Sequence, residues 1–562
     1  MATEKRYTKL PIGIDNFEKI IKDEYYYADK TLMIKDLIDK GGEVNVFTRP
    51  RRFGKSLGIS MLQYFFDNLK KGETNLFDGL NISRAGDKYI EHQNRYPVIK
   101  LSLKEASKIE FESSITMLIS EISSEFKRHD YILESSCLKE DSRVLYQRLA
   151  SEKATIDEYS KSLRFLSECL ELYHNEKAII LIDEYDVPLE KAYFNGYYDE
   201  MVNFIRSFFS GALKTNDSLK FAVITGCLRV SKESIFTGVN NLNIVSILSD
   251  NYGEYFGLTE PEVEVMLAHY NLEHKADEMR DWYNGYLFGE TTVYNPWSSI
   301  KYLYDELYSK IGFPIAHWSN TSSNSIIRDL IAIADDETKD EIEQLIQGET
   351  ITKPINEDIV YSDITKNMDN LWNFLFFTGY LKKVSKKQIG VENHFELTIP
   401  NNEILYIYKR QIREWFDERV KEVDMTNLYT AVLSQNIATF EDELTSLLGE
   451  SISYMDSLEF FYHGFLTGIL RGIKGYRTVS NRESGSGRGD IFLRPTSIRK
   501  PAVVIEVKVA NEARHLEKKC DEALVQIEEK KYDSELHRAG YMQIIKYGIA
   551  FYRKDCMIKI QE

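Results

Sequence analysis

The stretch VNVFTRPRRFGKS, residues 44–56, decides how the first half of this chain folds. A short apolar run is followed by Gly54-Lys55-Ser56, which opens a helical pattern over residues 57–69. Backbone N–H groups at a helix N-terminus bind anions, the lysine reaches terminal phosphates and the serine can ligate Mg²⁺. The full pattern has another glycine five residues before Gly54, where this chain has Arg49. We predict a phosphate-binding loop whose nucleotide-binding residues are Arg52, Gly54, Lys55 and Ser56.

The first 250 residues alternate short apolar runs with helical patterns, which is typical of a parallel α/β sheet. Near-continuous apolar runs indicate strands that are buried on both faces. The predicted strands cover residues 44–47, 96–101, 178–182 and 219–224, with a fifth candidate at 243–248.

Two acids follow the third of these strands, at Asp183 and Glu184. Ligands of open α/β sheets bind at the carboxyl ends of the strands. We expect Asp183 to hold Mg²⁺ through water and Glu184 to act as the general base for an attacking water. Thr225 ends the next strand and is placed to sense the γ-phosphate. Arg229 either stabilises charge there or forms a plain surface salt bridge.

The pattern changes after residue 255. A capped helix start at residues 258–264 introduces a region that reads as mainly helical, with strand signals only at 380–384 and 394–399. A further set of strands follows a helical stretch at 458–470. We therefore divide the chain into an ATPase core (1–255), a helical lid and middle region (256–450) and a C-terminal α/β domain (451–562).

Several motifs together resemble the bacterial AAA-ATPase-like proteins that carry a PD-(D/E)XK nuclease domain at the C-terminus. The resemblance covers nearly the whole chain and includes the phosphate loop, so the missing first glycine is implied to be a family trait. It implies a P-loop NTPase core with a helical lid, and ATP with Mg²⁺ as cofactors. The matching segments are residues 10–17, 26–31, 49–56, 181–186, 282–286, 294–297, 318–322 and 377–381. From their composition, the Trp- and Tyr-rich middle segments are expected to be packing and turn elements.

A second constellation lies near the C-terminus, in residues 480–493 and 502–509. Period-2 alternation sends Val503, Ile505, Val507 and Val509 to one face and Glu506 and Lys508 to the other. Burying an acid and a lysine in so apolar a strand costs free energy unless both have partners. Asp490 can add a second carboxylate, and two carboxylates with a backbone carbonyl suit Mg²⁺ or Mn²⁺. Lys508 would orient or activate the water that attacks a phosphodiester.

This region resembles the restriction-endonuclease-like PD-(D/E)XK fold, which carries Asp490, Glu506 and Lys508 over as the catalytic set. The fold usually adds a glutamate from its first helix, and Glu459 matches that place, although helix-surface glutamates are abundant. Gln526 begins a motif that looks like the helix after the catalytic core of the family, where a glutamine can contact the DNA backbone or the site. A solvent-exposed helix face without such a role is an equal alternative. Arg482 and Arg488 are candidates for phosphate contacts.

Charge is unevenly distributed along the chain. Residues 453–562 hold 19 Lys and Arg against 15 Asp and Glu, a net charge of +4, which leaves −21 on the rest of a chain whose total is −17. Because electrostatic fields are screened within about 8–10 Å, the C-terminal region can bind a polyanion despite the acidic body. The partner that we expect at the C-terminal region is nucleic acid, and DNA before RNA.

The remaining composition is that of a globular protein, with 43% hydrophobic and 28% charged residues. Five scattered cysteines without a C-x-x-C pair argue against structural zinc and favour a reducing, cytoplasmic compartment. No window approaches 18 apolar residues, and the first residues lack a secretory apolar core, so we expect no membrane contact. The sequence also allows a homo-oligomer, since some ATPases form their active site between two subunits.

These observations favour an ATPase coupled to a Mg²⁺-dependent DNA phosphodiesterase in one chain. The alternative is an ATP-dependent switch or scaffold whose nuclease-like domain binds nucleic acid or protein without cutting. Cleavage that depends on Lys508 separates the two.

Overall fold

Continuous apolar runs form the main sheet of the N-terminal part. In this computed structural model, β1 (Val44–Thr48) and β3 (Ala178–Asp183) are buried at every position, as strands covered on both faces require. The sheet is parallel, in the order β2-β3-β4-β1-β5, with β2 (Val98–Ser102), β4 (Leu219–Gly226) and β5 (Leu242–Val245). The five strands predicted from the sequence are confirmed.

The structure describes residues 8–228, 235–236, 241–309, 312–318, 327, 334–357, 368–389, 392–422, 424–449, 459–480 and 490–561. The chain forms two compact units, one of residues 1–323 with 350–407 and one of residues 324–349 with 408–562. The division into three domains at residues 255 and 450 stays a prediction.

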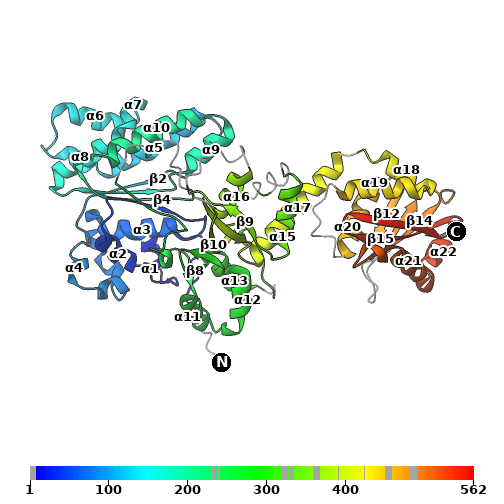
Figure 1. Ribbon diagram of the computed structural model, residues 1–562. Helices are drawn as coiled ribbons and strands as arrows, with labels where there is room; N and C mark the ends of the chain where they lie inside the picture. Colours follow the sequence, from blue (N-terminus) through cyan, green and yellow to red (C-terminus); the bar gives the residue numbers. More distant parts are fainter. Residues whose placement is uncertain are drawn as a thin grey trace. The chain divides into compact units, whose positions relative to one another are not determined.

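Helices cover both faces of the parallel sheet. Helix α3 packs against β3 and β4 from one face, and α8 and α10 lie on the other (Figure 1). The helices of this region are α1 (Phe17–Lys22), α2 (Leu32–Lys40), α3 (Lys55–Phe66), α4 (Asp87–Ile90), α5 (Phe111–Arg128), α6 (Glu140–Ala150), α7 (Ile156–Ser160), α8 (Ser162–His174), α9 (Val187–Asn195) and α10 (Tyr198–Leu213).

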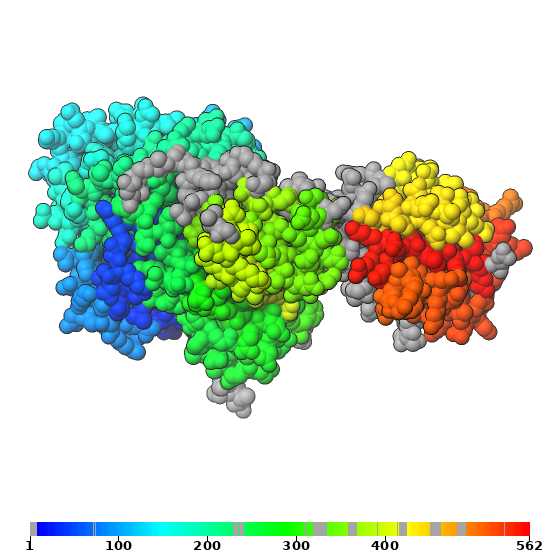
Figure 2. All heavy atoms as spheres, viewed as in Figure 1, coloured from blue at the N-terminus to red at the C-terminus, as the bar shows by residue number. Residues whose placement is uncertain are grey.

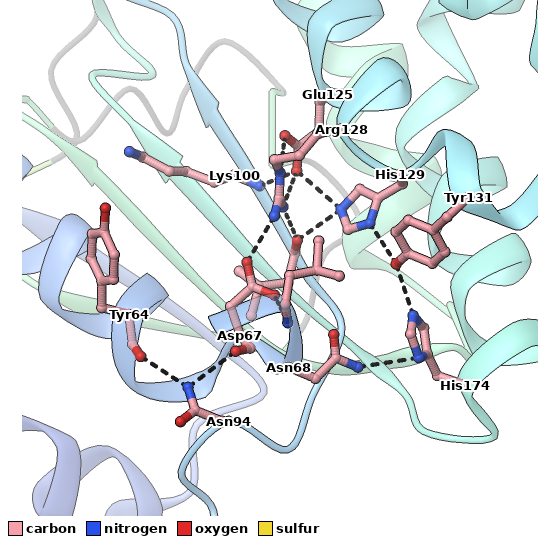
Figure 3. Close-up of polar contacts among 12 residues, drawn as sticks. Tyr64, Asp67, Asn68, Asn94, Lys100, Glu125, Arg128, His129, Tyr131 and His174 are labelled. Carbon is pink, nitrogen blue, oxygen red and sulfur yellow. Dashed lines mark hydrogen bonds and ion pairs between the residues drawn. The ribbon is translucent and has the colours of Figure 1, made fainter. Parts of the chain in front are cut away.

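Side chains of α5 complete the outer edge of β2, which ends the sheet (Figure 3). Glu125 Oε1 accepts the backbone N–H of Lys100 at 2.8 Å, and Arg128 donates to the carbonyl of Val98. Arg128 also pairs with Asp67 at 2.7 Å. Edge strands expose unpaired backbone groups that invite pairing with another chain. These side chains occupy those groups and bind α5 to the sheet.

The region after the main sheet contains more strands than its sequence suggests. It has a three-stranded sheet in the order β6-β8-β7 and another in the order β10-β11-β9, beside the expected helices. Strands of two to four residues carry too little periodicity to be detected. The elements are β6 (Leu258–Thr259), α11 (Glu260–Tyr270), α12 (Ala276–Tyr283), β7 (Tyr286–Phe288), β8 (Thr291–Tyr294), α13 (Pro296–Tyr308), β9 (Ile351–Pro354), α16 (Met368–Phe377), β10 (Lys382–Ile389), β11 (Glu392–Thr398) and α17 (Asn402–Glu422).

The C-terminal unit is a mixed five-stranded sheet between two helical layers. Its strands β12 (Tyr476–Ser480), β13 (Asp490–Pro495), β14 (Ala502–Val509), β15 (Ile544–Tyr552) and β16 (Asp555–Gln561) lie in sequence order, and only β14 and β15 are parallel. Helices α18 (Thr426–Ser434) and α19 (Ile437–Gly449), yellow in Figure 2, cover one face together with α20 (Glu459–Leu470). Helices α21 (Leu516–Lys530) and α22 (Asp533–Arg538) cover the other, and α15 (Asp336–Ile346) also belongs to this unit.

Within the described part of the chain, no helix is both long enough and apolar enough to cross a membrane.

Candidate functional site

The phosphate loop ends in a helix N-terminus that is shaped for an anion. Gly54 has φ 84° and caps α3, a left-handed conformation that glycine adopts without strain. Lys55 Nζ donates to the carbonyl oxygens of Arg49 and Pro50, at 2.9 Å each, and therefore lies across the loop. Ser56 follows in the first turn and is partly exposed. A cationic side chain and free helix N–H groups meet at this point, as phosphate binding requires.

Arg49, which stands where a glycine is expected, has a structural role. Its side chain is fully buried between the rings of Phe256 and Phe288, 5.1 and 5.0 Å from their centres. Nη1 donates to the carbonyls of Thr48 and Val245 at 2.9 and 2.8 Å. Burial lowers the pKa of Arg49 to about 9. The guanidinium thus attaches the loop to the region after the main sheet and does not face the phosphate position.

The acids predicted to serve hydrolysis lie at the edge where the parallel strands end. Strand β4 lies between β1 and β3, so Thr225 stands between the phosphate loop and Asp183, and its hydroxyl donates to Asp183 Oδ1. Asp183 is only 6% exposed. Glu184 follows in a left-handed conformation, φ 54°. Burial, and then the charge of Asp183, raise the pKa of Glu184, which suits a group that must accept a proton from water.

The middle motifs surround the phosphate loop. Arg52 lies over the ring of Trp297, 4.4 Å from its centre, and Arg51 pairs with Glu190 at 2.5 Å. Gly379 allows close approach, because a Cβ there would lie 3.1 Å from Pro50. The motifs that contain Trp297 and Gly379 therefore pack against the phosphate loop itself. Arg229 lies outside the described residues.

An apolar pocket opens beside the start of α3. It encloses about 680 Å³, its open mouth included, between the N-terminal segment, α3 and the region of α11 and α13. Lys30 lies at its edge, held by Glu262 at 2.5 Å and by the carbonyl of Glu254 at 2.6 Å. Ligand pockets are concave and mostly apolar, with few polar groups. The lining includes Pro11, Tyr26, Tyr27, Leu57, Met61 and Met266.

The C-terminal unit buries an ion pair in its central strand. Glu506 is 0% exposed, and its Oε1 accepts a hydrogen bond of 2.9 Å from Lys508 Nζ, whose side chain is 18% exposed. Their neighbours Ile505 and Val507 point to the opposite face and pack in the core with α18 to α20. The alternation predicted from the sequence is confirmed, and the acid and the lysine contact each other on the face of α21.

The register of the sheet brings another predicted residue to this place. Asp490 is the cross-strand partner of Glu506 in the antiparallel pair of β13 and β14, and such partners are the nearest neighbours across a sheet. Glu459 is the first residue of α20, which packs on β12, β13 and β14. The structure does not describe the side chains of Asp490 and Glu459. Arg482 and Arg488 lie outside the described residues altogether.

Helix α21 lies close against this strand. Gly548 is the partner of Glu506 in β15, and a Cβ at Gly548 would lie 2.5 Å from the carbonyl oxygen of Cys520 in α21. On the same helix, the hydrogen bond from Lys519 and, to a smaller extent, the charge of Lys508 lower the pKa of Glu522. Gln526 stands one turn further along, half-buried. The helix therefore places polar side chains beside the buried ion pair.

Comparison with known families agrees with both geometries. Residues 11–236 match the model of a family described as predicted AAA-ATPase, and residues 457–561 match that of the PD-(D/E)XK nuclease superfamily. The chain joins an AAA-ATPase-like domain to a PD-(D/E)XK domain. A curated relative, named "Uncharacterized protein in vnfD 5'region" from Azotobacter chroococcum mcd 1, is 28% identical over 403 residues, which cover 70% of this chain and 68% of the relative.

AAA-ATPase-like and PD-(D/E)XK domains usually use a nucleotide and a divalent metal ion. The donor chemistry fits both: the AAA-ATPase-like domain offers the oxygens of Ser56 and Asp183, and the PD-(D/E)XK domain offers the carboxylate of Glu506 and the backbone carbonyls of β14. Oxygen donors of this kind suit Mg²⁺ or Mn²⁺. Within the described ranges, no three acidic, histidine or cysteine side chains form a ready-made metal cluster.

Sequence reasoning assigned no role to several residues of these sites. The pocket residues Tyr26, Tyr27 and Lys30 lie in a segment that carried the family resemblance, so a signal existed without a function attached to it. Lys519 and Glu522 look like ordinary surface charges of a helix, and the place of Glu522 near Lys508 follows only from the packing of α21.

Proposed function

We propose that this chain binds and hydrolyses ATP and couples it to a metal-dependent DNA phosphodiesterase. The observation that carries the proposal is the buried pair of Glu506 and Lys508, whose register partner is Asp490. A buried ion pair contributes little net stability, because desolvation of both charges offsets their attraction. Its presence in the centre of an apolar strand is explained better by catalysis than by folding.

At the nucleotide site, the first turn of α3 and Lys55 would bind the β- and γ-phosphates of ATP. Ser56 and Asp183 would hold Mg²⁺, which neutralises the phosphate charge when bound. Thr225 keeps the Asp183 carboxylate in place through its hydroxyl. Glu184, whose pKa is raised by burial, would accept the proton of the attacking water. Arg52 and Arg229 are the proposed cationic contacts to the nucleotide.

The apolar pocket would hold the adenine base. Its lining includes Gly54, which caps α3, and Leu57 in the first turn of that helix. One nucleotide can therefore place its phosphates on the helix and its base in the pocket. Apolar and aromatic walls bury the flat faces of a base. Loss of ATP affinity in a Tyr26→Ala protein, with the Lys55→Ala protein as the reference for phosphate contacts, would support this placement.

At the nuclease site, Asp490, Glu506 and Glu459 are the proposed carboxylate ligands for Mg²⁺ or Mn²⁺. The chemistry that such an ion supplies is charge neutralisation at the scissile phosphate. Lys508 Nζ, held at 2.9 Å from Glu506, would orient the attacking water and donate to a phosphate oxygen. Gln526, Arg482 and Arg488 would contact the DNA backbone, which sets position and not sequence preference.

The test is cleavage of single-stranded, linear and supercoiled DNA by the full chain with Mg²⁺ or Mn²⁺, with and without ATP. We expect cleavage by the wild type and a loss of at least 100-fold in Lys508→Ala. The matched control is Lys500→Ala, which removes an exposed lysine from the segment just before β14. DNA binding without cleavage in every condition would reject the phosphodiesterase in favour of an ATP-dependent switch.

A further inference from the structure

The phosphate loop contacts the start of helix α13 through Arg52. Its guanidinium lies 4.4 Å from the centre of the Trp297 ring, and Trp297 is the second residue of α13. Arg52 has φ 71°, a conformation that costs a non-glycine residue free energy. Such strain is kept only where surrounding contacts hold it, and here one of those contacts is the tryptophan.

The next residue of α13 contacts a different helix. Ser298 Oγ donates to Glu403 Oε1 at 2.9 Å, and the backbone N–H of Trp318 donates to the same oxygen at 2.9 Å. Glu403 lies in the first turn of α17. One turn of α13 thus touches the phosphate loop on one side and α17 on the other.

Glu403 is an unusual group for such a contact. It is 0% exposed, and the described residues pair it with no lysine or arginine. Burial raises its pKa to about 7, although the hydrogen bonds from Trp318 and Ser298 lower it. A buried carboxylate depends on every hydrogen bond that it accepts. A small displacement of Ser298 therefore alters the anchoring of α17 strongly.

Helix α17 is the segment that continues into the other unit. It runs without interruption from Asn402 to Glu422, and the first unit ends at residue 407 while the second resumes at 408. A second contact holds its start: Asn401 Nδ2 donates to the carbonyl of Asn284 at 2.7 Å. The start of α17 is thus anchored to the segments that surround the phosphate loop.

We propose that the first turn of α13 is a relay that transmits the nucleotide state of the phosphate loop to α17, with Trp297 and Ser298 as its two contacts and Glu403 as the positioning residue that receives it. The proposal rests on the nucleotide site proposed above. A ligand shifts a conformational equilibrium only by binding its two states differently. Nucleotide that draws Arg52 toward its phosphates weakens the contact with Trp297 and so meets this condition.

The experiment measures hydrogen exchange of residues 402–407 in the full chain, with and without ATP, beside nucleotide affinity measured with a fluorescent ATP analogue. The variants are Ser298→Ala and Glu403→Gln at the α17 end and Trp297→Leu at the loop end. Ser299→Ala is the matched control, since this neighbouring serine is equally buried but its hydroxyl makes no hydrogen bond to Glu403.

In the wild type we expect ATP to change exchange at least fivefold both in the first turn of α13 and in residues 402–407. Ser298→Ala and Glu403→Gln should bind ATP within threefold of the wild type and keep the α13 response, but lose the α17 response. Trp297→Leu should lose both responses, and Ser299→Ala should lose neither.

Two results would overturn the relay while leaving the nucleotide site intact. One is a wild type that binds ATP without any change at residues 402–407. The other is an α17 response of wild-type size in both Ser298→Ala and Glu403→Gln. A chain that binds no ATP would instead reject the proposed nucleotide site, and the relay with it.

Discussion

Replacing Lys508 by methionine should destabilise the C-terminal unit and not only abolish cleavage. Lys508 Nζ lies 2.9 Å from Glu506 Oε1, and the Glu506 side chain is fully buried. Removing one partner of a buried ion pair costs about 3–5 kcal/mol, because the remaining charge loses its compensation. Glu506 stays buried in this variant, so we expect a loss of about 3 kcal/mol in the free energy of unfolding.

A double-mutant cycle tests this reasoning. Glu506→Gln removes the charge, and the double variant Glu506→Gln/Lys508→Met removes both charges and leaves an uncharged pair of similar volume. We expect the double variant to lose less than the sum of the single losses, with a coupling energy of about 1–3 kcal/mol. Scanning calorimetry of the full chain, with the C-terminal transition identified by hydrogen exchange of the β14 amides, measures the four proteins.

Divalent metal adds a second prediction to the same cycle. An ion that binds Glu506 compensates for the lost lysine, so Mg²⁺ at ten times its Kd should return about 1.4 kcal/mol to Lys508→Met. The same Mg²⁺ should do nothing for Glu506→Gln. Additive single losses, within about 0.5 kcal/mol, would refute the coupled buried pair. Equal effects of Mg²⁺ on both variants would refute metal binding at Glu506.

The fold makes three further predictions. Burial raises the pKa of Glu125, but hydrogen bonds from Arg128 and His129 outweigh it and place the pKa at about 2, below the ordinary 4.5. Its stabilising contribution should therefore be complete above pH 4.5 and fall away as the pH drops toward 2; acid unfolding that is unchanged in Glu125→Gln would contradict this. Gly548→Val should push α21 away from β15 and reduce both stability, by about 1–3 kcal/mol, and DNA cleavage; a wild-type melting curve would show that the helix adapts. Gly226→Ala would place a Cβ 2.5 Å from the buried ring of Tyr185 and should weaken ATP binding about tenfold, which titration with a fluorescent ATP analogue measures; unchanged affinity would show that the Tyr185 ring adapts to the added methyl group.

The strands that are buried on both faces can be predicted from the local sequence. The runs at residues 44–48, 178–183 and 502–509 are rich in apolar residues, and each is a largely buried strand. Their chemistry-bearing residues stand at positions that a period of two or a strand end defines. Glu506 and Lys508 on one face, and Asp183 and Glu184 at a carboxyl end, follow from these rules without any long-range information.

The short strands and the packing of the middle motifs do not follow from such rules. Strands of two to four residues, such as β6 and β9, form because other segments pair with them, and these partners are distant in sequence. The same holds for Trp297 and Gly379: their residue types indicate packing, while the partner, the phosphate loop, is about 240 and 330 residues away along the chain.

The amino-acid sequence alone therefore pointed to the two chemistries proposed for this protein, because phosphate binding and metal-assisted hydrolysis need particular residue types at short, fixed spacings. Only the tertiary structure decided what surrounds them. Arg49 stands where the sequence pattern has a loop glycine, and it is buried between Phe256 and Phe288. Glu403 looks like an ordinary acid in the first turn of a helix and is fully buried against Ser298. The physical reason is that burial and partnership depend on contacts between segments far apart in the chain, and local periodicity holds no information on which distant segment closes over a given side chain.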